Sequence, residues 1–369
     1  MIKLWKSLII TWMLYTGIGV CMAQKTAGAP GKIRKLTDTV GFARYPWQMD
    51  SIMNRIHRLQ GDKLEKSFID AGVSEETLWK VAICPHDDYS YAGYMYPLSL
   101  NNVEAKTIVL VGVCHKAKQF GLENKIIFES FDTWTGPYGP VKISPLRNEI
   151  IKDLPTGIAI VHDSVQQAEH SLEALIPFLQ YYNPDIEIIP ILIPAMLASN
   201  MDIFGKLLAQ SIKYVTSRHN MQWGNDFAMV LSTDAVHYGN EDWGGKKYDW
   251  YGVDKEGYIK AKDHESEIIR NTLTGEISAG KLRRFSSYTV DDKNYREYKW
   301  TWCGRYSVPF GLWVSMHLER ILGIEIKGTL LDYSTSIEQK PIDVHDLKMG
   351  ITAPANLKHW VGYVSMGYQ

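Results

Sequence analysis

Residues 107–115 read Thr-Ile-Val-Leu-Val-Gly-Val-Cys-His (TIVLVGVCH), an apolar run that ends abruptly in a cysteine and a histidine. Apolar residues at successive positions, rather than at alternate ones, are typical of a strand that is buried on both faces of a sheet. We therefore expect Thr107–Val113 to be a buried strand, with Cys114 and His115 just beyond its carboxyl end.

Similar runs recur along the chain and alternate with amphipathic stretches. The strand-like runs are Val81–Cys84, Glu187–Ile193 (EIIPILI) and Phe227–Leu231, and the helical patterns are Ser171–Tyr182, Met201–Tyr214, Gly257–Leu273 and Phe310–Leu322. This alternation predicts an α/β fold with a sheet covered on both faces. Pro190 inside EIIPILI fits a strand edge or a bulge better than a central position.

The composition excludes several classes of protein. The 369 residues are 45% hydrophobic and carry a net charge of −1, which is ordinary for a folded globular chain. No basic stretch predicts a nucleic-acid partner, and no acidic block predicts a disordered tail. Since no linker divides the chain, we expect a single domain over residues 41–369, preceded by a polar lead-in over residues 24–40.

The N-terminal residues 1–23 have the pattern of a signal peptide. Lys3 and Lys6 precede the apolar run Leu8–Val20, which is short for a membrane span of about 20 residues. Cleavage after Ala23 predicts export to the periplasm or the extracellular space, and no integral membrane span in the mature chain. An uncleaved anchor is one alternative. Lipoprotein processing at Cys21 is another, although Val20 is bulky for it.

Cleavage after Ala23 would leave Cys84, Cys114 and Cys303. An odd number of cysteines in an exported chain argues against a complete set of disulfides, so a free or metal-bound thiol is expected.

Reactive side chains follow four strand-like runs. These runs are Val81–Cys84, Thr107–Val113, Phe227–Leu231 and Tyr298–Trp302. If these strands are parallel neighbours, their carboxyl ends meet at one rim, where open α/β sheets bind ligands. Asp87 and Asp88 follow His86 directly, and the residues that this rim would bring together are His86, His115, Asp234, His237 and Cys303.

Two imidazoles and one anionic ligand suit Fe(II), Zn(II) or Cu better than Mg or Ca. His237 could then exchange a proton near neutral pH, with Asp234 orienting it. Simpler interpretations stay open for each residue alone. A histidine after a strand is often a loop residue, Cys303 could be a small buried apolar residue, and Asp87-Asp88 could turn the chain.

Several of these stretches together resemble the Memo-like family, which in bacteria is called AmmeMemoRadiSam system protein B. The stretch Cys84-Pro85-His86 with Tyr89 and Gly93 resembles the family's P-H-A-G-Y-x-Y-S-G element. Further resemblances are Gly112-Val113-Cys114-His115, Ala168–Leu179 (E-H-S-x-E-x-x-L-P-F-L), Ile188–Leu192, Ser232–Gly239, Cys303-Gly304-Arg305 and the terminal VGYVSMGYQ. This chain has Asp87-Asp88 where the family usually has Ala-Gly.

The resemblance implies a three-layer α/β/α sandwich with a mostly parallel central sheet, similar to class III extradiol dioxygenases. It places the metal ligands on His86, His115 and Cys303. It places acid/base positions on Asp234 and His237, and a further pocket histidine on His170.

We therefore expect a metal-dependent oxidoreductase, dioxygenase-like and using Fe(II), with Cu or Zn as alternatives, that acts on an unknown small molecule. Two other functions stay open. One is a binding protein without turnover that holds a metal or a peptide of another exported protein, and the other is a metal-assisted hydrolase.

Overall fold

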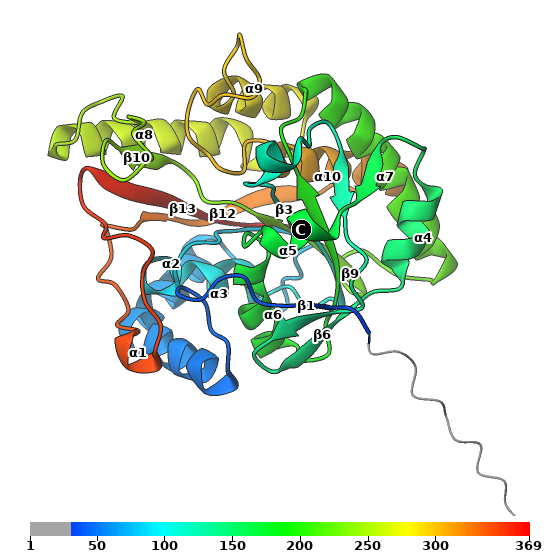
Figure 1. Ribbon diagram of the computed structural model, residues 1–369, viewed down its shortest axis with the longest axis horizontal. Helices are drawn as coiled ribbons and strands as arrows, with labels where there is room; N and C mark the ends of the chain where they lie inside the picture. The colour runs from blue at the N-terminus through cyan, green and yellow to red at the C-terminus, as the bar shows by residue number, and fades with distance from the viewer. Residues whose placement is uncertain (1–30) are drawn as a thin grey trace, which may run out of the picture. The chain divides into compact units, whose positions relative to one another are not determined.

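A long mixed sheet runs through residues 31–369, the part of the chain that the computed structural model describes (Figure 1). The order of its main strands is β1 (Ile33–Arg34), β5 (Thr133–Gly136), β6 (Gly139–Ile143), β8 (Glu187–Ile193), β3 (Thr107–Val113), β9 (Phe227–Ser232), β2 (Val81–Cys84), β13 (His359–Tyr368), β12 (Lys327–Thr335) and β11 (Gly275–Glu276). The expected signal peptide, the alternative at Cys21 and the start of the lead-in lie outside the described residues, so export stays a prediction.

The centre of the sheet is parallel and its sides are mixed. Strands β6, β8, β3, β9 and β2 pair in parallel, whereas β13 pairs antiparallel with both β2 and β12. Three short strands lie outside the order of main strands: β4 (Ile126–Phe128) pairs with β8 and with β7 (Ala159–Val161), and β10 (His237–Gly239) pairs with β13. The predicted α/β sandwich is confirmed, with its parallel pairing concentrated in the central strands.

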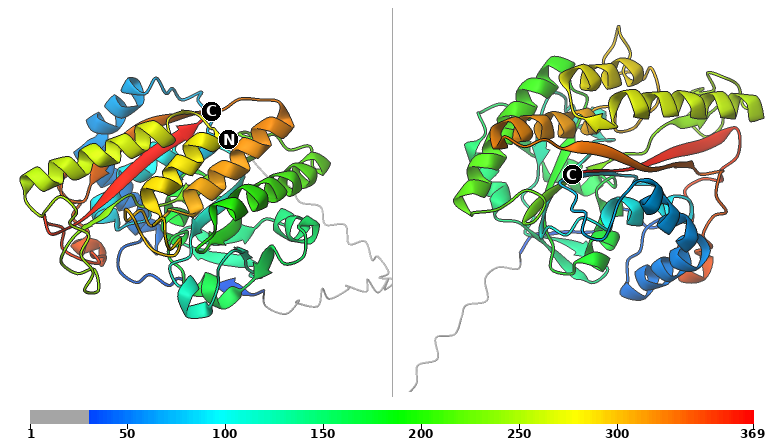
Figure 2. Two further views of the ribbon diagram at one scale, coloured as in Figure 1. Left: turned by 90° about the horizontal axis from the view of Figure 1, so that it is seen from above. Right: turned by 180° about the vertical axis from the view of Figure 1, so that it is seen from behind.

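Helices cover both faces of the sheet (Figures 1 and 2). One layer contains α4 (Leu146–Asp153), α7 (Ala198–Arg218), α8 (Lys255–Thr272), α9 (Ala279–Thr289) and α10 (Ser307–Leu322). The other contains α1 (Pro46–Asp70), α2 (Tyr89–Ala92), α3 (Met95–Leu100) and α6 (Ile176–Tyr182).

The two layers explain the uninterrupted apolar runs of the central strands. Ile108 and Leu110 of β3 pack into one hydrophobic cluster, while Val109 and Val111 pack into the other. Successive side chains of a strand point to opposite faces, so a strand covered on both sides needs apolar residues throughout.

Pro190 lies inside the sheet rather than at its edge, because β8 pairs with β3 along its whole length. On its other side β8 pairs only at Glu187–Ile188, with β6, and at Leu192, with β4. Residue 190 therefore lies in a gap between two neighbours on that side, where the missing N–H of a proline is tolerated.

The expected strand over Tyr298–Trp302 is wrong. Tyr298 and Trp302 form only isolated bridges, with Val290 and Val236. Cys303 instead lies in the turn that leads into α10. The predicted helix over Ser171–Tyr182 is shorter than expected, since a 3₁₀ turn at Glu173–Leu175 precedes α6.

Part of the expected polar lead-in is buried. Arg34 in β1 is 1% exposed, its Nη1 lies 2.6 Å from Glu173 Oε2, and its guanidinium carbon lies 4.2 Å from the ring centroid of Trp134. Residues 32–369 form one compact unit that includes this strand. Within the described residues no helix is both long and apolar enough to cross a membrane.

Candidate metal centre

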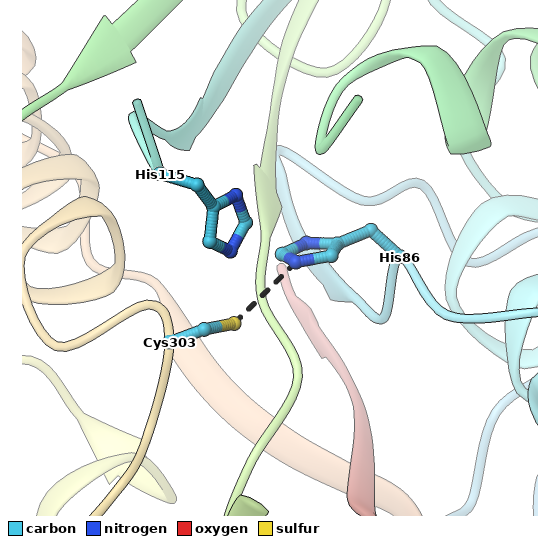
Figure 3. Close-up of side chains that lie close together, drawn as sticks. All are labelled: His86, His115 and Cys303. Carbon is cyan, nitrogen blue, oxygen red and sulfur yellow. Dashed lines mark hydrogen bonds between the residues drawn. The ribbon is translucent and has the colours of Figure 1, made fainter. Parts of the chain in front are cut away.

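The carboxyl ends of the central parallel strands carry most of the predicted site. His86 follows β2, His115 follows β3 and Asp234 follows β9, so the parallel pairing brings the three to one rim. Cys303 reaches the same place from the turn before α10 (Figure 3).

His86, His115 and Cys303 converge in the structure (Figure 3). One ligand atom from each lies within 4.8 Å of the others, and His86 Nε2 is 3.4 Å from Cys303 Sγ. His86 and Cys303 are buried, whereas the His115 side chain is 27% exposed. The arrangement therefore presents two imidazoles and a sulfur to a common point that remains open on the His115 side.

Hydrogen bonds to the far side of each ring fix which nitrogen faces that point. His115 Nδ1 lies 2.8 Å from Glu169 Oε1, a carboxylate oxygen that only accepts, so Nδ1 carries the proton. Ser232 donates its hydroxyl proton to the Ser171 carbonyl at 2.6 Å, so its oxygen accepts from His86 Nδ1 at 2.8 Å. Both Nε2 atoms therefore keep a free lone pair, which is the form that binds metals.

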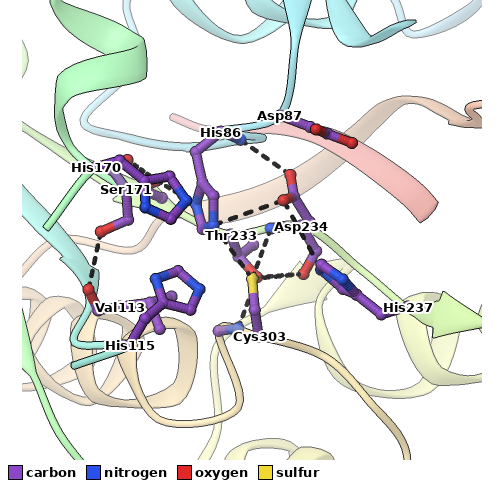
Figure 4. Close-up of polar contacts among 12 residues, drawn as sticks. His86, Asp87, Val113, His115, His170, Ser171, Thr233, Asp234, His237 and Cys303 are labelled. Carbon is purple, nitrogen blue, oxygen red and sulfur yellow. Dashed lines mark hydrogen bonds and ion pairs between the residues drawn. The ribbon is translucent and has the colours of Figure 1, made fainter. Parts of the chain in front are cut away.

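Gly304 allows Cys303 to approach the end of β9. A Cβ on Gly304 would lie 2.2 Å from Thr233 Oγ1, which accepts a hydrogen bond from the Gly304 N–H at 3.1 Å. The backbone N–H of Asp234 points at Cys303 Sγ from 3.1 Å (Figure 4). Such a donor stabilises the anionic form of a sulfur.

Burial shifts the pKa of both buried members of the group. Burial, with help from His115, lowers the pKa of His86 well below its usual value, so this imidazole is neutral. Burial, and then Asp234, raises the pKa of the Cys303 thiol. The thiol therefore has to lose its proton when an ion binds.

Asp234, His237 and His170 surround the three residues (Figure 4). Asp234 Oδ1 accepts the backbone N–H of His86 at 2.9 Å, and its Oδ2 is 3.9 Å from His237 Nε2, beyond hydrogen-bond reach. The ring of His170 stacks on His115 with centroids 4.9 Å apart.

The two histidines among the acid/base candidates are neutral. Burial lowers the pKa of His237 to about 3 and that of His170 to about 4. Burial, followed by the Asp87 carboxylate, raises the pKa of Asp234. His237 Nε2 is buried and has no hydrogen-bond partner within residues 31–369.

A pocket of about 540 Å³ contains these groups. Its walls include Asp87 and Asp88; burial, and then Asp87, raises the pKa of Asp88 to about 7. The predicted site residues that line the pocket are His86, His115, His170, Asp234 and His237. Cys303 does not line this pocket. It contacts His86 and lines two neighbouring cavities.

Three positioning residues were not predicted. Glu169 and Ser232 lie within motifs that the sequence analysis quoted, but no role was given to them. Glu265 lies on the buried face of α8 and accepts the indole N–H groups of Trp300 and Trp302 at 2.6 and 2.7 Å. Glu265 could have been found from the sequence, because a carboxylate on the apolar face of a predicted amphipathic helix must have a buried partner.

The fold and the site together define an α/β protein whose strand ends gather two imidazoles and a thiol that can hold a metal ion. The Memo-like protein family model matches residues 45–344, and the chain belongs to this family.

Curated relatives carry the same family name. A MEMO1 family protein of Thermococcus kodakarensis is 25% identical over 287 residues, which cover 74% of this chain and 87% of the relative. Another, from Pyrococcus abyssi, is 26% identical over 289 residues, which cover 75% of this chain and 87% of that relative.

Proposed function

We propose that this protein is a metal-dependent oxidoreductase of the dioxygenase-like type, in which His86, His115 and Cys303 hold the metal. One observation carries the proposal: both histidines have their Nδ1 beside a hydrogen-bond acceptor, which turns Nε2 toward the centre, and a ligand atom of each lies within 4.8 Å of one sulfur. Histidines that bind metals are held in this way by their outer hydrogen bonds.

The donor set favours Fe(II), with Cu or Zn as alternatives. Nitrogen and sulfur ligands suit these ions, whereas Mg and Ca prefer oxygen. A redox-active ion held there would supply electron transfer and oxygen chemistry. The 27% exposure of His115 leaves the centre accessible to a small molecule from the pocket side.

His237 is the residue we propose for proton transfer. Its Nε2 is buried without a hydrogen-bond partner among the described residues, and His237 lines the pocket, so a bound substrate is the partner that could bond to this nitrogen. Asp234 Oδ2 lies 3.5 Å from His86 Nε2 and 3.9 Å from His237 Nε2, and we propose that it assists His237, while His170 forms part of the wall against which the substrate rests.

Metal analysis of protein purified without oxygen tests the ligand set. We expect near-stoichiometric iron in the natural protein and its loss in His86→Ala and Cys303→Ser. Cys114→Ser is the matched control, because Cys114 is also a buried free thiol at a strand end but belongs to no candidate ligand group among the described residues. Equal iron in Cys303→Ser and Cys114→Ser would contradict the proposal.

The identity of the ion separates the remaining functions. Stoichiometric zinc would favour metal-assisted hydrolysis, and an absence of metal with unchanged stability of the ligand variants would favour a binding protein. With iron present, oxygen consumption is measured over a panel of small aromatic substrates. We expect His237→Gln to retain the metal and lose turnover, which separates its role from that of the ligands.

A further inference from the structure

A second pocket, of about 730 Å³, lies on another side of the candidate centre. His115 and Cys303 belong to its wall, so it reaches the proposed metal position. Its wall also includes Lys118, Tyr298, Arg305 and Tyr306. None of these four residues has a part in the function proposed above.

Arg305 is a buried cation without an anionic partner. It is 8% exposed, and no carboxylate within residues 31–369 forms an ion pair with it. Its guanidinium carbon lies 3.4 Å from the ring centroid of Tyr298 and 4.5 Å from that of Tyr306. Its Nη2 donates to the Arg296 carbonyl at 3.0 Å, but its Nε is buried and donates to no described residue.

The two aromatic rings offset only part of the cost of this burial. A cation over an aromatic ring gains about 0.5–2 kcal/mol, whereas a buried charge normally has an opposite charge and hydrogen bonds beside it. Contact with both rings also limits the movement of the guanidinium. A guanidinium held in this way, with an N–H that is unpaired among the described residues, suits binding of a carboxylate or phosphate.

The carboxylates of this pocket are already paired. Glu123 Oε2 lies 2.6 Å from Arg296 Nη2, and Glu297 Oε2 lies 3.7 Å from Lys246 Nζ. Arg305 and Lys118 are therefore the cations of the wall that have no carboxylate partner among the described residues. The first pocket has the opposite character, because Asp87, Asp88 and Asp242 line it. An anionic group is thus favoured on the Arg305 side of the centre.

We propose that this pocket binds the oxyanion group, carboxylate or phosphate, of a small organic molecule, with Arg305 as the main contact and Lys118 as a second charge. The rest of that molecule would extend toward His115 and Cys303. Calling this molecule the substrate rests on the proposed function, whereas its binding to the pocket does not. The proposal therefore specifies an anionic small-molecule class for a site whose substrate is otherwise undefined.

Calorimetric titration of the full chain, with and without iron, tests the proposal with three probes that share one ring: benzoate, phenyl phosphate and neutral benzamide. We expect benzoate or phenyl phosphate to bind both forms of the protein, and benzamide to bind about tenfold more weakly or not at all. The anion that binds with the higher affinity identifies whether the pocket prefers a carboxylate or a phosphate group. Binding without iron shows that the anion does not depend on the metal.

Variants assign the binding to Arg305. Arg305→Gln should weaken binding of the anion about tenfold, and Lys118→Gln should weaken it a few-fold. Arg58→Gln makes the same charge change at an exposed arginine and should leave the affinity unchanged. If Arg305→Gln does not fold, Arg305→Lys keeps the charge but loses the planar fork, and should also weaken binding. Equal affinity in the natural protein and in the folded Arg305 variant would overturn the proposal, as would equal binding of benzamide.

The two proposals fail separately. Anion binding that depends on Arg305, in a protein that holds no metal, would remove the oxidoreductase proposal and keep the pocket. Stoichiometric iron in a protein that binds neither anion would do the reverse.

Discussion

Glu169 and Ser232 decide which nitrogen each histidine presents to the candidate centre. Glu169 is buried and accepts from the His115 ring and also from the His115, His170 and Ser171 backbone N–H groups. Burial alone would raise its pKa, but His115, His170 and the Ser171 N–H outweigh burial and lower the pKa to about 2. Glu169 is therefore a fixed negative charge behind His115.

Replacing Glu169 by Gln should weaken metal binding without removing a ligand. The amide nitrogen would face an N–H group where a carboxylate oxygen now accepts, and the His115 ring would lose its charged partner. We expect an affinity loss of about 10–100-fold, measured by competition with a chelator. Glu149→Gln is the control, because Glu149 holds the exposed His219 ring at 2.9 Å, close to the 2.8 Å between Glu169 and His115, without a role in the centre. An unchanged affinity in Glu169→Gln would show that His115 needs no fixed tautomer.

Ser232→Ala tests the same point at His86. The substitution removes the oxygen that accepts from His86 Nδ1 and leaves that buried N–H without its partner. We expect metal affinity to fall by about tenfold in the same competition assay. Ser315→Ala should have no such effect, since Ser315 is equally buried but donates to Gly311 within α10. Equal affinities in the two variants would contradict the role of Ser232.

These outer residues show the limit of prediction from single positions. His86, His115 and Cys303 were predicted because imidazole and sulfur have a distinctive chemistry. Glu169 and Ser232 have side chains that occur in any loop, and their role exists only because the fold brings them behind a ring. The pairing of Ser232 with His86 joins residues that no local pattern connects.

Helix α8 is attached to the centre through Glu265. Its Oε1 accepts the indole N–H groups of Trp300 and Trp302, and its Oε2 lies 3.3 Å from the Val236 N–H. Trp302 immediately precedes Cys303, and Val236 immediately precedes His237. One buried carboxyl group thus positions the segments that carry the sulfur and the proposed base.

The stability of the protein should depend on pH through Glu265. Burial, only partly offset by the two indoles, raises its pKa from 4.5 to about 7, so the folded chain holds this proton more tightly than the unfolded chain. Stability is therefore lost as pH rises from about 4.5 to about 7, by roughly 3 kcal/mol for a shift of this size.

Glu265→Gln removes this titration and isolates its contribution. We expect the variant to gain stability relative to the natural protein as pH rises through that window, measured by urea unfolding at each pH. Glu256→Gln, an exposed carboxylate at the start of α8, should show no such gain. Parallel pH profiles for the natural protein and Glu265→Gln would contradict the assignment.

Among the elements, buried strands were the most predictable. The runs at β2, β3, β8 and β9 need apolar residues on both faces, and that requirement is visible in the sequence. The segment 298–302 resembles them because its tryptophans are apolar, yet those indoles are oriented by hydrogen bonds to Glu265. Cys303 lies beside the two histidines, as the sequence led us to expect, although the strand expected to precede it is absent.

Across the whole described unit, Arg34 connects the N-terminal strand to the interior. Arg34 and Glu173 are both almost fully buried, and Glu173 also accepts the backbone N–H groups of Thr37 and Asp38. The composition of this segment predicted a polar lead-in. Its burial could not be predicted because it depends on Glu173 and Trp134, far along the chain.

Arg34→Met should destabilise the protein by about 3–5 kcal/mol, because it leaves the Glu173 charge buried without its partner. The free energy of unfolding in urea measures this loss. The double variant Arg34→Met/Glu173→Gln should recover part of it. Lys32→Met, which breaks the exposed pair with Asp163, is the control and should cost less than about 1 kcal/mol. A similar loss in both single variants would show that Arg34 has no special role.

The position of β2 has a consequence for biosynthesis. This strand, which leads to His86, lies between β9 and β13, and Val81–Ile83 pair with Met366–Tyr368. A chain still emerging from the ribosome lacks β13 and cannot complete the sheet around His86. The sheet on both sides of β2 would therefore be complete only after synthesis of residue 368.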